Sequence, residues 1–241
     1  MMSLSIIIPT YNEVKQLKHT IKKLRSLKKK INNYELVFID DFSNDGSYQQ
    51  LISFKKKYSK IKIYKNNKKG LGGAIKLGIQ KSRNKYICIF MCDLSDDVND
   101  VQKYYKIINN NQNLDAVFGS RFIKNSKVKN YPFFKLIINR VANNIIRLLF
   151  FSKYNDFTNA FKIYKKTVLL KLFPIVSENF NVFLELPLKI ITRKLSYKIV
   201  SINWNGRKIG VSKFKIKEVG SKYIFTLVYC FLEKILLNKK I

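Results

Sequence analysis

Residues 4–13 have the sequence LSIIIPTYNE, in which a short apolar run ends at a proline and polar residues follow. A run of this length, rich in β-branched residues, predicts a buried strand over residues 4–8. From Val14 to Leu27, apolar residues recur three or four positions apart, which predicts a helix over residues 14–30. A strand that leads directly into an amphipathic helix is the first half of a βαβ unit.

The same alternation continues through the first half of the chain. We expect strands over 35–39, 61–64, 86–91 and 116–119, and helices over 47–58, 71–81 and 100–109. Alternating strands and helices predict an α/β fold with a central, mostly parallel sheet flanked by helices. Such sheets bind ligands beyond the carboxyl ends of their strands, so polar residues at these ends are candidates for a site.

The second half of the chain has a different pattern. We expect helices over 133–151, 180–192 and 223–237, and strands over 161–164 and 196–204. No stretch has the composition of a linker, so we expect one domain over residues 1–215 and an amphipathic helical extension over residues 216–241. No apolar stretch reaches the roughly 18 residues of a membrane-spanning helix, and the amino terminus lacks the pattern of a signal peptide.

Composition narrows the function classes. The 241 residues include 47 Lys and Arg against 15 Asp and Glu, a formal net charge of +32. This charge is compatible with nucleic acid, an anionic membrane or a phosphate-rich substrate as the binding partner. A codon bias towards lysine could equally produce it. The 3 cysteines are too few for a disulfide framework and indicate a reducing, cytoplasmic compartment. The only histidine, His19, lies in a lysine-rich stretch, which argues against a zinc site or a Ser-His-Asp system.

Asp40 and Asp41 follow the strand predicted at 35–39 and are the first candidate site residues. Two adjacent carboxylates repel each other unless a ligand or a cation holds them. A carboxylate in this place can accept hydrogen bonds from a nucleobase or a ribose. The alternative is structural, an Asx turn followed by a helix N-cap at Ser47.

Asp93, Asp96 and Asp97 follow the strand predicted at 86–91. Three carboxylates so close in the sequence suit a hard divalent cation such as Mg²⁺ or Mn²⁺. The alternative, which is compatible with metal binding, is that Asp96 or Asp97 caps the next helix.

Two further segments combine glycine with basic residues. Residues 68–74, KKGLGGA, predict a helix entry whose backbone N–H groups can face an anion, although the segment is not a P-loop. Arg207 to Lys213 follow a predicted strand, and taken alone they are as easily a basic surface loop.

Together these segments have an order that resembles family 2 glycosyltransferases of the GT-A fold. More narrowly, the order resembles the dolichyl-phosphate mannosyltransferase branch and its bacterial polyprenyl-phosphate relatives, from residue 4 to about residue 215. The matching segments are IIIPTYNE at 6–13, VFIDDFSNDGS at 37–47, KGLGGA at 69–74, GSRF at 119–122, the basic helix from Lys135 to Asn143, DFTNAFK at 156–162, Glu185, and RKIGVSK at 207–213. The resemblance implies a nucleotide-sugar-binding α/β domain and a hexosyltransferase.

The resemblance also implies roles for individual residues. The nucleotide-sugar would be bound by Pro9, Tyr11, Glu13, Asp40, Asp41, Lys69 and Gly70. A divalent cation, Mg²⁺ or Mn²⁺, would be held by Asp93 and Asp96, with Asp41 and Asp97 as further candidates. Catalysis would depend on Asp93, Arg121, Arg207 and Lys213. An acceptor phosphate would be bound by Arg121, Lys135, Asn139 and Ser212.

The chain departs from the family pattern at two places. Met91 stands where the usual Asp-x-Asp metal motif has its first carboxylate, so Asp93 remains and Asp96 or Asp97 can compensate. Asn159-Ala160 replaces the usual Ser-Gly, and Lys162 replaces an arginine. A phosphate contact at Lys162 would therefore lack the bidentate fork of a guanidinium.

From these features we expect an inverting glycosyltransferase that moves a sugar from a GDP- or UDP-linked donor to a polyprenyl phosphate, either dolichyl or undecaprenyl. The ionised phosphate can attack the anomeric carbon without a strong general base, while the cation neutralises the leaving diphosphate. One alternative is a saccharide acceptor in cell-surface polysaccharide synthesis, with Asp96 or Asp97 as base. A remote alternative is a basic nucleic-acid-binding protein, but the sequence contains no recognised nucleic-acid module.

A lipid acceptor implies peripheral binding at the cytoplasmic face of the membrane. Residues 133–151 and 223–237 each combine a broad apolar face with Lys or Arg, as do helices that lie in the headgroup region. The alternative is that both pack on the sheet as core helices. A small membrane subunit is compatible with the sequence as a partner, and we expect no nucleic acid.

Overall fold

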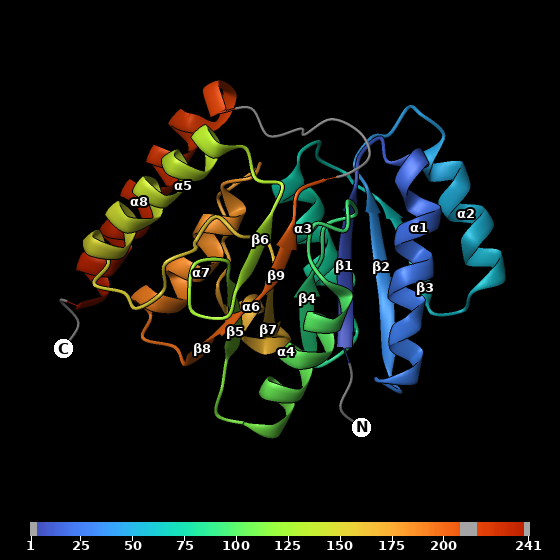
Figure 1. Ribbon diagram of the computed structural model, residues 1–241, viewed down its shortest axis with the longest axis horizontal. Helices are drawn as coiled ribbons and strands as arrows, with labels where there is room; N and C mark the ends of the chain where they lie inside the picture. Colours follow the sequence, from blue (N-terminus) through green and yellow to red (C-terminus); the bar gives the residue numbers. More distant parts are fainter. Residues whose placement is uncertain (1–3, 208–215, 239–241) are drawn as a thin grey trace.

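The computed structural model describes residues 4–207 and 216–238, which form a central sheet between two layers of helices (Figure 1). The main sheet contains β1 (Leu4–Thr10), β2 (Tyr34–Asp40), β3 (Ile61–Lys65), β4 (Tyr86–Ile89), β5 (Ala116–Ser120), β7 (Lys162–Lys165) and β8 (Tyr197–Ser201). A small second sheet contains β6 (Lys127–Lys129) and β9 (Asn203–Asn205). The helices are α1 (Val14–Arg25), α2 (Ser47–Lys57), α3 (Leu71–Lys81), α4 (Val98–Asn110), α5 (Phe133–Leu149), α6 (Lys166–Lys171), α7 (Val182–Thr192) and α8 (Ile216–Asn238), with a 3-10 turn, η1, at Ser26–Lys29.

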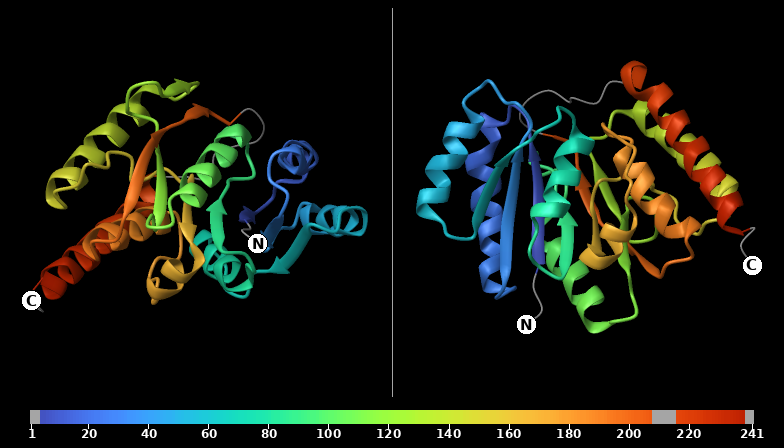
Figure 2. Two further views of the ribbon diagram at one scale, coloured as in Figure 1. Left: turned by 90° about the horizontal axis from the view of Figure 1, so that it is seen from below. Right: turned by 180° about the vertical axis from the view of Figure 1, so that it is seen from behind.

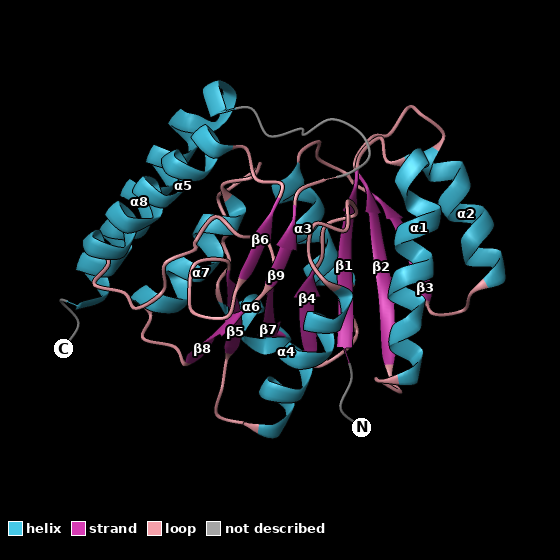
Figure 3. Cartoon of the chain, viewed as in Figure 1, coloured by secondary structure: helices cyan, strands magenta, loops and turns pink. Residues whose placement is uncertain are grey.

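The strands of the main sheet lie in the order β3-β2-β1-β4-β7-β5-β8. β1 pairs in parallel with β2 on one side and with β4 on the other, and Thr10 at its end lies beside Asp40. β7 runs antiparallel between β4 and β5. Helices cover both faces of the sheet (Figure 3). The expected α/β fold with a mostly parallel sheet is therefore confirmed.

The alternation of side chains along β1 divides the interior into two apolar cores. Successive side chains of a strand point to opposite faces. Leu4, Ile6 and Ile8 accordingly pack in the core under α1 and α4, whereas Ile7 packs in the core under α3, α6 and α7. The views of Figure 2 show these two helical layers from further directions. Burial of β1 on both faces explains why its sequence is a continuous apolar run.

Several expected elements have different bounds in the structure; the helix expected over 223–237, for example, begins at Ile216, and the strand expected over 86–91 ends at Ile89. The helix expected over 14–30 ends at Arg25, and the chain continues as η1. The single strand expected over 196–204 is two strands, because the chain leaves the main sheet after β8 and pairs as β9 with β6. An apolar run shows that a segment is extended, but it does not show which partner the segment pairs with.

Helices α5 and α8 lie at the end of the molecule opposite α1 and α2 (Figure 1). α8 packs one side against α7, where Thr226 and Cys230 are fully buried, and α5 buries Ile146. Large apolar side chains remain exposed on and directly after α5 (Phe133, Phe134, Ile137, Ile138, Val141, Ile145, Leu148, Leu149, Phe151) and on α8 (Ile224, Phe225, Val228, Phe231, Leu232, Ile235, Leu236, Leu237). Each helix thus has one packed side and one exposed apolar side.

Over the described residues, no helix is long and apolar enough to cross a membrane. The division of the chain into a domain over residues 1–215 and an extension over 216–241 stays a prediction.

Each strand that leads to the acidic residues is followed by a non-glycine residue in the left-handed region. These residues are Asn12 (φ 50°) after β1, Phe42 (φ 61°) after β2 and Leu94 (φ 56°) after β4. A side chain with a Cβ atom disfavours this conformation, which persists only where the surrounding structure imposes it. The turns beyond these three strands therefore have a defined backbone geometry.

Gly119 in β5 provides a test of the core. A Cβ atom at this position would lie 1.8 Å from Oη of Tyr104 and 2.8 Å from Cγ2 of Ile202. We expect Gly119→Ala to lower the free energy of unfolding by about 1–3 kcal/mol through overpacking, as measured by urea denaturation. Tyr104→Phe removes a buried hydroxyl that has no hydrogen-bond partner among the described residues, so the double variant should recover part of this loss. Equal losses in the single and double variants would contradict this account.

Candidate active site

The loops after β1 and β2 are tied together by hydrogen bonds. The backbone N–H of Glu13 donates to Oγ of Ser47 at 2.9 Å, and the N–H of Val14 donates to Oδ2 of Asp45 at 3.0 Å. Burial acts against ionisation of Asp45, but hydrogen bonds from Ser47 and Val14 lower the pKa of its carboxyl. Ser47 is the first residue of α2 rather than its N-cap, which is Gly46. Its hydroxyl instead fixes the loop that carries Tyr11 and Glu13.

Asp40 and Asp41 have different environments. Asp40 accepts the backbone N–H of Ser43 through Oδ2, while its buried Oδ1 has no hydrogen-bond partner among the described residues. Asp41 is turned towards the glycine segment, where Oδ1 accepts from Nδ2 of Asn66 at 2.7 Å and from the N–H of Gly70 at 2.9 Å. Asp40 therefore retains an oxygen that can accept from a ligand, and Asp41 fixes the turn before α3.

Three carboxylates lie beyond β4, and each has a different environment. Asp97 caps α4 and accepts the N–H of Asn99 at 2.9 Å. Asp93 accepts the N–H of Ser95 at 3.0 Å. Asp96 is buried, and its Oδ1 has no hydrogen-bond partner among the described residues. Burial, and next the neighbouring Asp93 carboxylate, raise the pKa of Asp96 to about 8.

Arg207 links the loops after β1 and β4. Its Nη2 lies 2.5 Å from Oε1 of Glu13, and its Nε lies 3.4 Å from Oδ2 of Asp93. Burial acts against the charge of Arg207, but the carboxylates of Glu13 and Asp93 raise the pKa of its guanidinium above the ordinary value. The structure thus brings together three residues that are distant in the sequence and that were expected to belong to one site.

The donor set beyond β4 suits a divalent cation only in part. Among residues 4–207 and 216–238, no group of three or more His, Cys, Asp or Glu side chains is placed to hold a metal ion. The oxygen of Asp96 without a partner and the carboxylate of Asp93 are hard donors of the kind that Mg²⁺ and Mn²⁺ prefer. A cation here would need its remaining ligands from a bound diphosphate or from water, which is usual for Mg²⁺.

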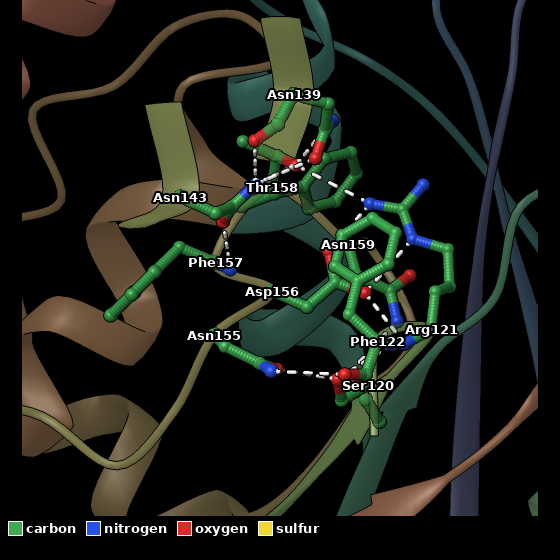
Figure 4. Close-up of polar contacts among 12 residues, drawn as sticks. Ser120, Arg121, Phe122, Asn139, Asn143, Asn155, Asp156, Phe157, Thr158 and Asn159 are labelled. Carbon is green, nitrogen blue, oxygen red and sulfur yellow. Dashed lines mark hydrogen bonds and ion pairs between the residues drawn. The ribbon is translucent and has the colours of Figure 1, made fainter. Parts of the chain in front are cut away.

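Arg121 is locked in place by Asp156 (Figure 4). Nε and Nη2 of Arg121 donate to the two carboxylate oxygens of Asp156 at 2.9 and 2.6 Å, and the backbone N–H of Arg121 donates to the same group at 2.8 Å. Burial disfavours the charge of Arg121, but Asp156 raises the pKa of the guanidinium above its ordinary value. Arg121 was expected to be a phosphate ligand, and most of its donor capacity is used inside the protein.

Asn139 and Asn143 connect α5 to the same network. Nδ2 of Asn139 donates to Oγ1 of Thr158 at 3.0 Å, and Nη2 of Arg121 approaches the same hydroxyl at 3.4 Å. Oδ1 of Asn143 accepts the backbone N–H of Phe157 at 2.6 Å (Figure 4). The turn between Asp156 and Thr158 therefore fixes α5 relative to Arg121.

Lys162 does not have the role that the sequence suggested. Its side chain is buried, and its ammonium group donates to the carbonyl oxygens of Phe157 and Asn159. Burial lowers the pKa of Lys162 to about 7. A phosphate contact through Lys162 is therefore wrong for this structure, because the ammonium faces backbone carbonyls in the interior.

The other expected residues lie at different depths. Pro9 is part of β1 and is buried, whereas Lys69 is exposed, with its Nζ 6.0 Å from the ring centroid of Tyr11. Lys135 is exposed on α5. Ser212 and Lys213 lie outside the described residues.

A cavity of about 340 Å³ opens beside Asp40 at the ends of β2 and β3. It is lined by Asp40, Phe42, Ser43, Tyr48, Gln49, Lys65 and Asn66. Tyr48 offers an aromatic ring beneath the ammonium of Lys65, at 4.4 Å from its centroid. Size and lining suit a flat, polar ring such as a nucleobase.

Two structural residues of the site were missed in the sequence. Asn66 holds Asp41, and Thr158 joins Arg121 to α5. Asn66 is a polar residue that follows a predicted strand, as Asp40 and Asp93 are, so its position in the sequence could have identified it as a candidate site residue. Thr158 stood inside a recognised segment, but nothing in its local pattern indicated its partners.

The arrangement of strands and helices is that of known GT-A glycosyltransferases. The structure is similar to that of glucosyl-3-phosphoglycerate synthase from Mycobacterium tuberculosis, with a TM-score of 0.73, 14% identity, and coverage of 95% of this chain and 80% of the other. Another structure of that enzyme, with a TM-score of 0.72, 14% identity and the same coverage, contains Mn²⁺, uridine diphosphate and glucosyl-3-phosphoglycerate. At this identity the similarity establishes the fold.

The chain belongs to glycosyl transferase family 2, because the model of that family matches residues 5–173. The family expected from the sequence is confirmed. The matched region contains β1, β2 and β4 with the acidic residues at their ends, and it also contains Arg121 and Asp156.

Several curated proteins are similar in sequence. The dolichol-phosphate mannosyltransferase of Pyrococcus furiosus is 30% identical over 147 residues, 61% of this chain and 41% of that protein. The dolichyl-phosphate beta-glucosyltransferase of Dictyostelium discoideum is 28% identical over 83% of this chain and 66% of its own length. The polyprenol monophosphomannose synthase of Mycolicibacterium smegmatis is 24% identical over 86% of this chain and 79% of its own length. The chain thus spans less than two thirds of the length of the first two relatives.

The pair of Arg121 and Asp156 can be tested by its effect on stability. Removal of one partner leaves an uncompensated buried charge, so Asp156→Ala should lower the free energy of unfolding by about 3–5 kcal/mol. The control is Glu178→Ala, which removes the exposed ion pair with Lys68 and should cost less than about 1 kcal/mol. If urea denaturation shows that Asp156→Ala and Glu178→Ala lower the free energy of unfolding by equal and small amounts, Asp156 does not hold a buried charge.

Proposed function

We propose that this protein transfers a sugar from a nucleotide-sugar to the phosphate of a polyprenyl lipid. The observation that carries the proposal is the composition of α5, which places two predicted phosphate-binding residues, Lys135 and Asn139, on a helix with an exposed apolar side. A lipid with a phosphate head matches both features at once. The names of the three curated relatives, which refer to dolichol phosphate, dolichyl phosphate and polyprenol monophosphomannose, support the same conclusion.

The donor is assigned to the ends of β1, β2 and β4. The cavity beside Asp40 would receive the base, and the oxygen of Asp40 without a partner would accept a hydrogen bond from it. Tyr11, Glu13 and Pro9 would frame the nucleoside, and the turn at Lys69 and Gly70 would face the diphosphate. Both guanine and uracil carry ring N–H donors, so GDP- and UDP-linked sugars remain the two donor classes.

Asp93 and Asp96 would hold Mg²⁺ or Mn²⁺ at the diphosphate. A bound cation supplies Lewis-acid stabilisation of the charge that develops on the leaving nucleoside diphosphate. Arg207, held by Glu13 and Asp93, places a permanent positive charge beside the same position. Arg121, through Asp156, supports the acceptor side by fixing the turn that anchors α5.

The reaction would proceed with inversion at the anomeric carbon. An ionised lipid phosphate is already a nucleophile, so the protein needs to bring two anionic groups together rather than supply a strong base. The exposed Lys135 offers a cation for the acceptor phosphate, and the half-buried Asn139 would use the second N–H of the amide that bonds Thr158. In-line attack from the acceptor side would expel the diphosphate towards Arg207.

A lipid acceptor would require the protein to bind the membrane as a peripheral protein, and we propose that it does so at the cytoplasmic face. The exposed apolar residues of α5 and α8 would enter the headgroup region, and the net charge of +32 would add attraction to anionic lipids. The two helices touch near the end of α5, where the rings of Phe150 and Phe231 have centroids 6.1 Å apart. They would therefore approach the membrane together.

The reaction is tested with purified protein, Mn²⁺ and radiolabelled GDP- or UDP-sugars, with dolichyl or undecaprenyl phosphate in detergent. We expect a labelled product that partitions into organic solvent. Asp93→Ala should reduce the rate by at least about 100-fold, because a group that stabilises leaving-group charge contributes several kcal/mol to catalysis. Asp115→Asn, at the opposite end of the sheet, is the control. Label that appears only in a lengthened glycan would contradict the lipid acceptor and favour the saccharide alternative.

Membrane binding is tested by co-sedimentation with vesicles of phosphatidylcholine and 30% phosphatidylglycerol. We expect binding that weakens as salt rises, because the electrostatic part is screened. Phe225→Glu and Leu236→Glu on the exposed side of α8 should each weaken binding at least about threefold. Each removes apolar area that would be buried in the membrane and adds a negative charge, which the anionic lipid repels. The control is Ser53→Glu on α2, at the far end of the molecule, which makes the same change in net charge at an exposed residue. Equal losses in all three variants would mean that net charge, not α8, determines binding.

A further inference from the structure

The turn before α3 rests on a segment from a distant part of the chain, residues 172–181 between α6 and α7. The backbone N–H of Gly72 donates to the carbonyl oxygen of Glu178 at 2.9 Å. The backbones are so close that a Cβ atom on Gly70 would lie 2.5 Å from the Glu178 oxygen, and one on Gly72 would lie 2.2 Å from the Ser177 oxygen. Glycine is therefore required at both positions for this contact.

The same turn reaches the proposed donor site directly. Gly70 donates its N–H to Oδ1 of Asp41 at 2.9 Å, and Nδ2 of Asn66 donates to the same oxygen at 2.7 Å. Any displacement of the backbone at Glu178 would move Gly70 and Gly72, and with them the N–H of Gly70 that donates to Asp41. The position of residues 172–181 thus sets the position of the turn.

A buried ion pair on α7 fixes the first part of this segment. Glu185 and Lys189 lie 2.9 Å apart, and both side chains are fully buried. Glu185 accepts the backbone N–H groups of Val176 at 2.9 Å and Ser177 at 2.7 Å. Lys189 donates to the carbonyl oxygen of Leu172 at 3.1 Å and to that of Pro174. A buried pair is weak as a source of stability, but bonds of this number and geometry define one backbone conformation.

Helix α8 fixes the second part of the segment. Nδ2 of Asn181 donates to Oγ1 of Thr226 at 2.9 Å, and the hydroxyls of Ser177 and Thr226 lie 3.4 Å apart. Thr226 is fully buried where α8 packs against α7, and its hydroxyl donates to the carbonyl oxygen of Lys222 at 2.9 Å. A helix from the carboxyl-terminal part of the chain therefore contacts the segment on which the donor turn rests.

We infer that residues 172–181 are a support for the donor turn, and that Thr226 and the Glu185–Lys189 pair are positioning residues for donor binding. This inference rests on the proposed function, because the turn matters only where a nucleotide diphosphate binds. None of these side chains touches the proposed donor site. They act through the backbone of Ser177 and Glu178 on Gly70 and Gly72.

The test compares Thr226→Val, which is nearly isosteric and removes the hydroxyl, with Thr226→Ser, which keeps it. Dissociation constants for GDP and for UDP, each with Mn²⁺, are measured by calorimetry on the full chain, together with the KM values for donor and lipid phosphate and the midpoint of thermal unfolding. Loss of the hydrogen bond to Asn181 should weaken nucleotide binding about threefold to tenfold and leave the lipid phosphate KM unchanged. Thr226→Ser should bind nucleotide like the wild type even where its unfolding midpoint falls.

The matched control is Thr192→Val on α7. Thr192 is also buried, and its hydroxyl donates to the carbonyl of Lys189 at 3.2 Å without a bond to residues 172–181. Thr192→Val should lower the unfolding midpoint as Thr226→Val does, with no change in nucleotide affinity. Gly72→Ala disturbs the same contact from the side of the turn and should reproduce the loss of nucleotide affinity.

The outcomes separate this inference from the proposed function. If the wild type binds neither nucleotide, the donor assignment itself is wrong, and the inference falls with it. If the wild type binds nucleotide and Thr226→Val and Gly72→Ala bind equally well, the donor assignment stands and the support role is refuted. If Thr226→Val and Thr192→Val weaken binding equally, the effect is one of general stability, which also refutes it.

Discussion

Parallel pairing of β1 with β2 and with β4 is the constraint on which the candidate active site depends. It brings three carboxyl ends to one edge of the sheet, although the segments are separated by tens of residues. Asp40, Glu13 and Asp93 all lie along that edge because backbone hydrogen bonds fix the register of the strands, not because the side chains attract each other. The like charges this creates are offset by Arg207, which bridges two of the three loops.

Much of this edge could be predicted from the sequence for a physical reason. A parallel strand is buried on both faces, so its residues form a continuous apolar run, and the first polar residue marks the end of the strand. Asp40, the last residue of β2, and Asp93, four residues beyond β4, were found in this way. The antiparallel position of β7 between β4 and β5 was not predicted, because the sequence of a four-residue strand does not show which strands it pairs with or in which direction. The split of the last predicted strand into β8 and β9 was missed for the same reason.

The roles of basic residues were harder to predict than those of acidic ones. In a chain with so many lysines and arginines, the sequence does not show which cations have an internal partner. Arg121 and Lys162 were both assigned to phosphate, yet one is paired with Asp156 and the other donates to backbone carbonyls. The partner of Arg121 lies 35 residues away, and those of Lys162 lie 3, 5 and 21 residues away, so distance in the sequence did not identify them. Only the three-dimensional packing separates structural cations from those that face a ligand.

The left-handed residues at the strand ends have a consequence for how this fold can change. Asn12, Phe42 and Leu94 each hold a backbone geometry that glycine would adopt without strain. Glycine there would relieve this strain, but it would also raise the conformational entropy of the unfolded chain, and at Asn12 it would remove the side-chain oxygen that accepts the N–H of Asn44. Rigidity at the donor edge thus depends on larger side chains held in a backbone conformation that the surrounding structure imposes. Attempts to engineer a more heat-resistant variant should accordingly leave these three turns unchanged and seek their gains in the helical layers.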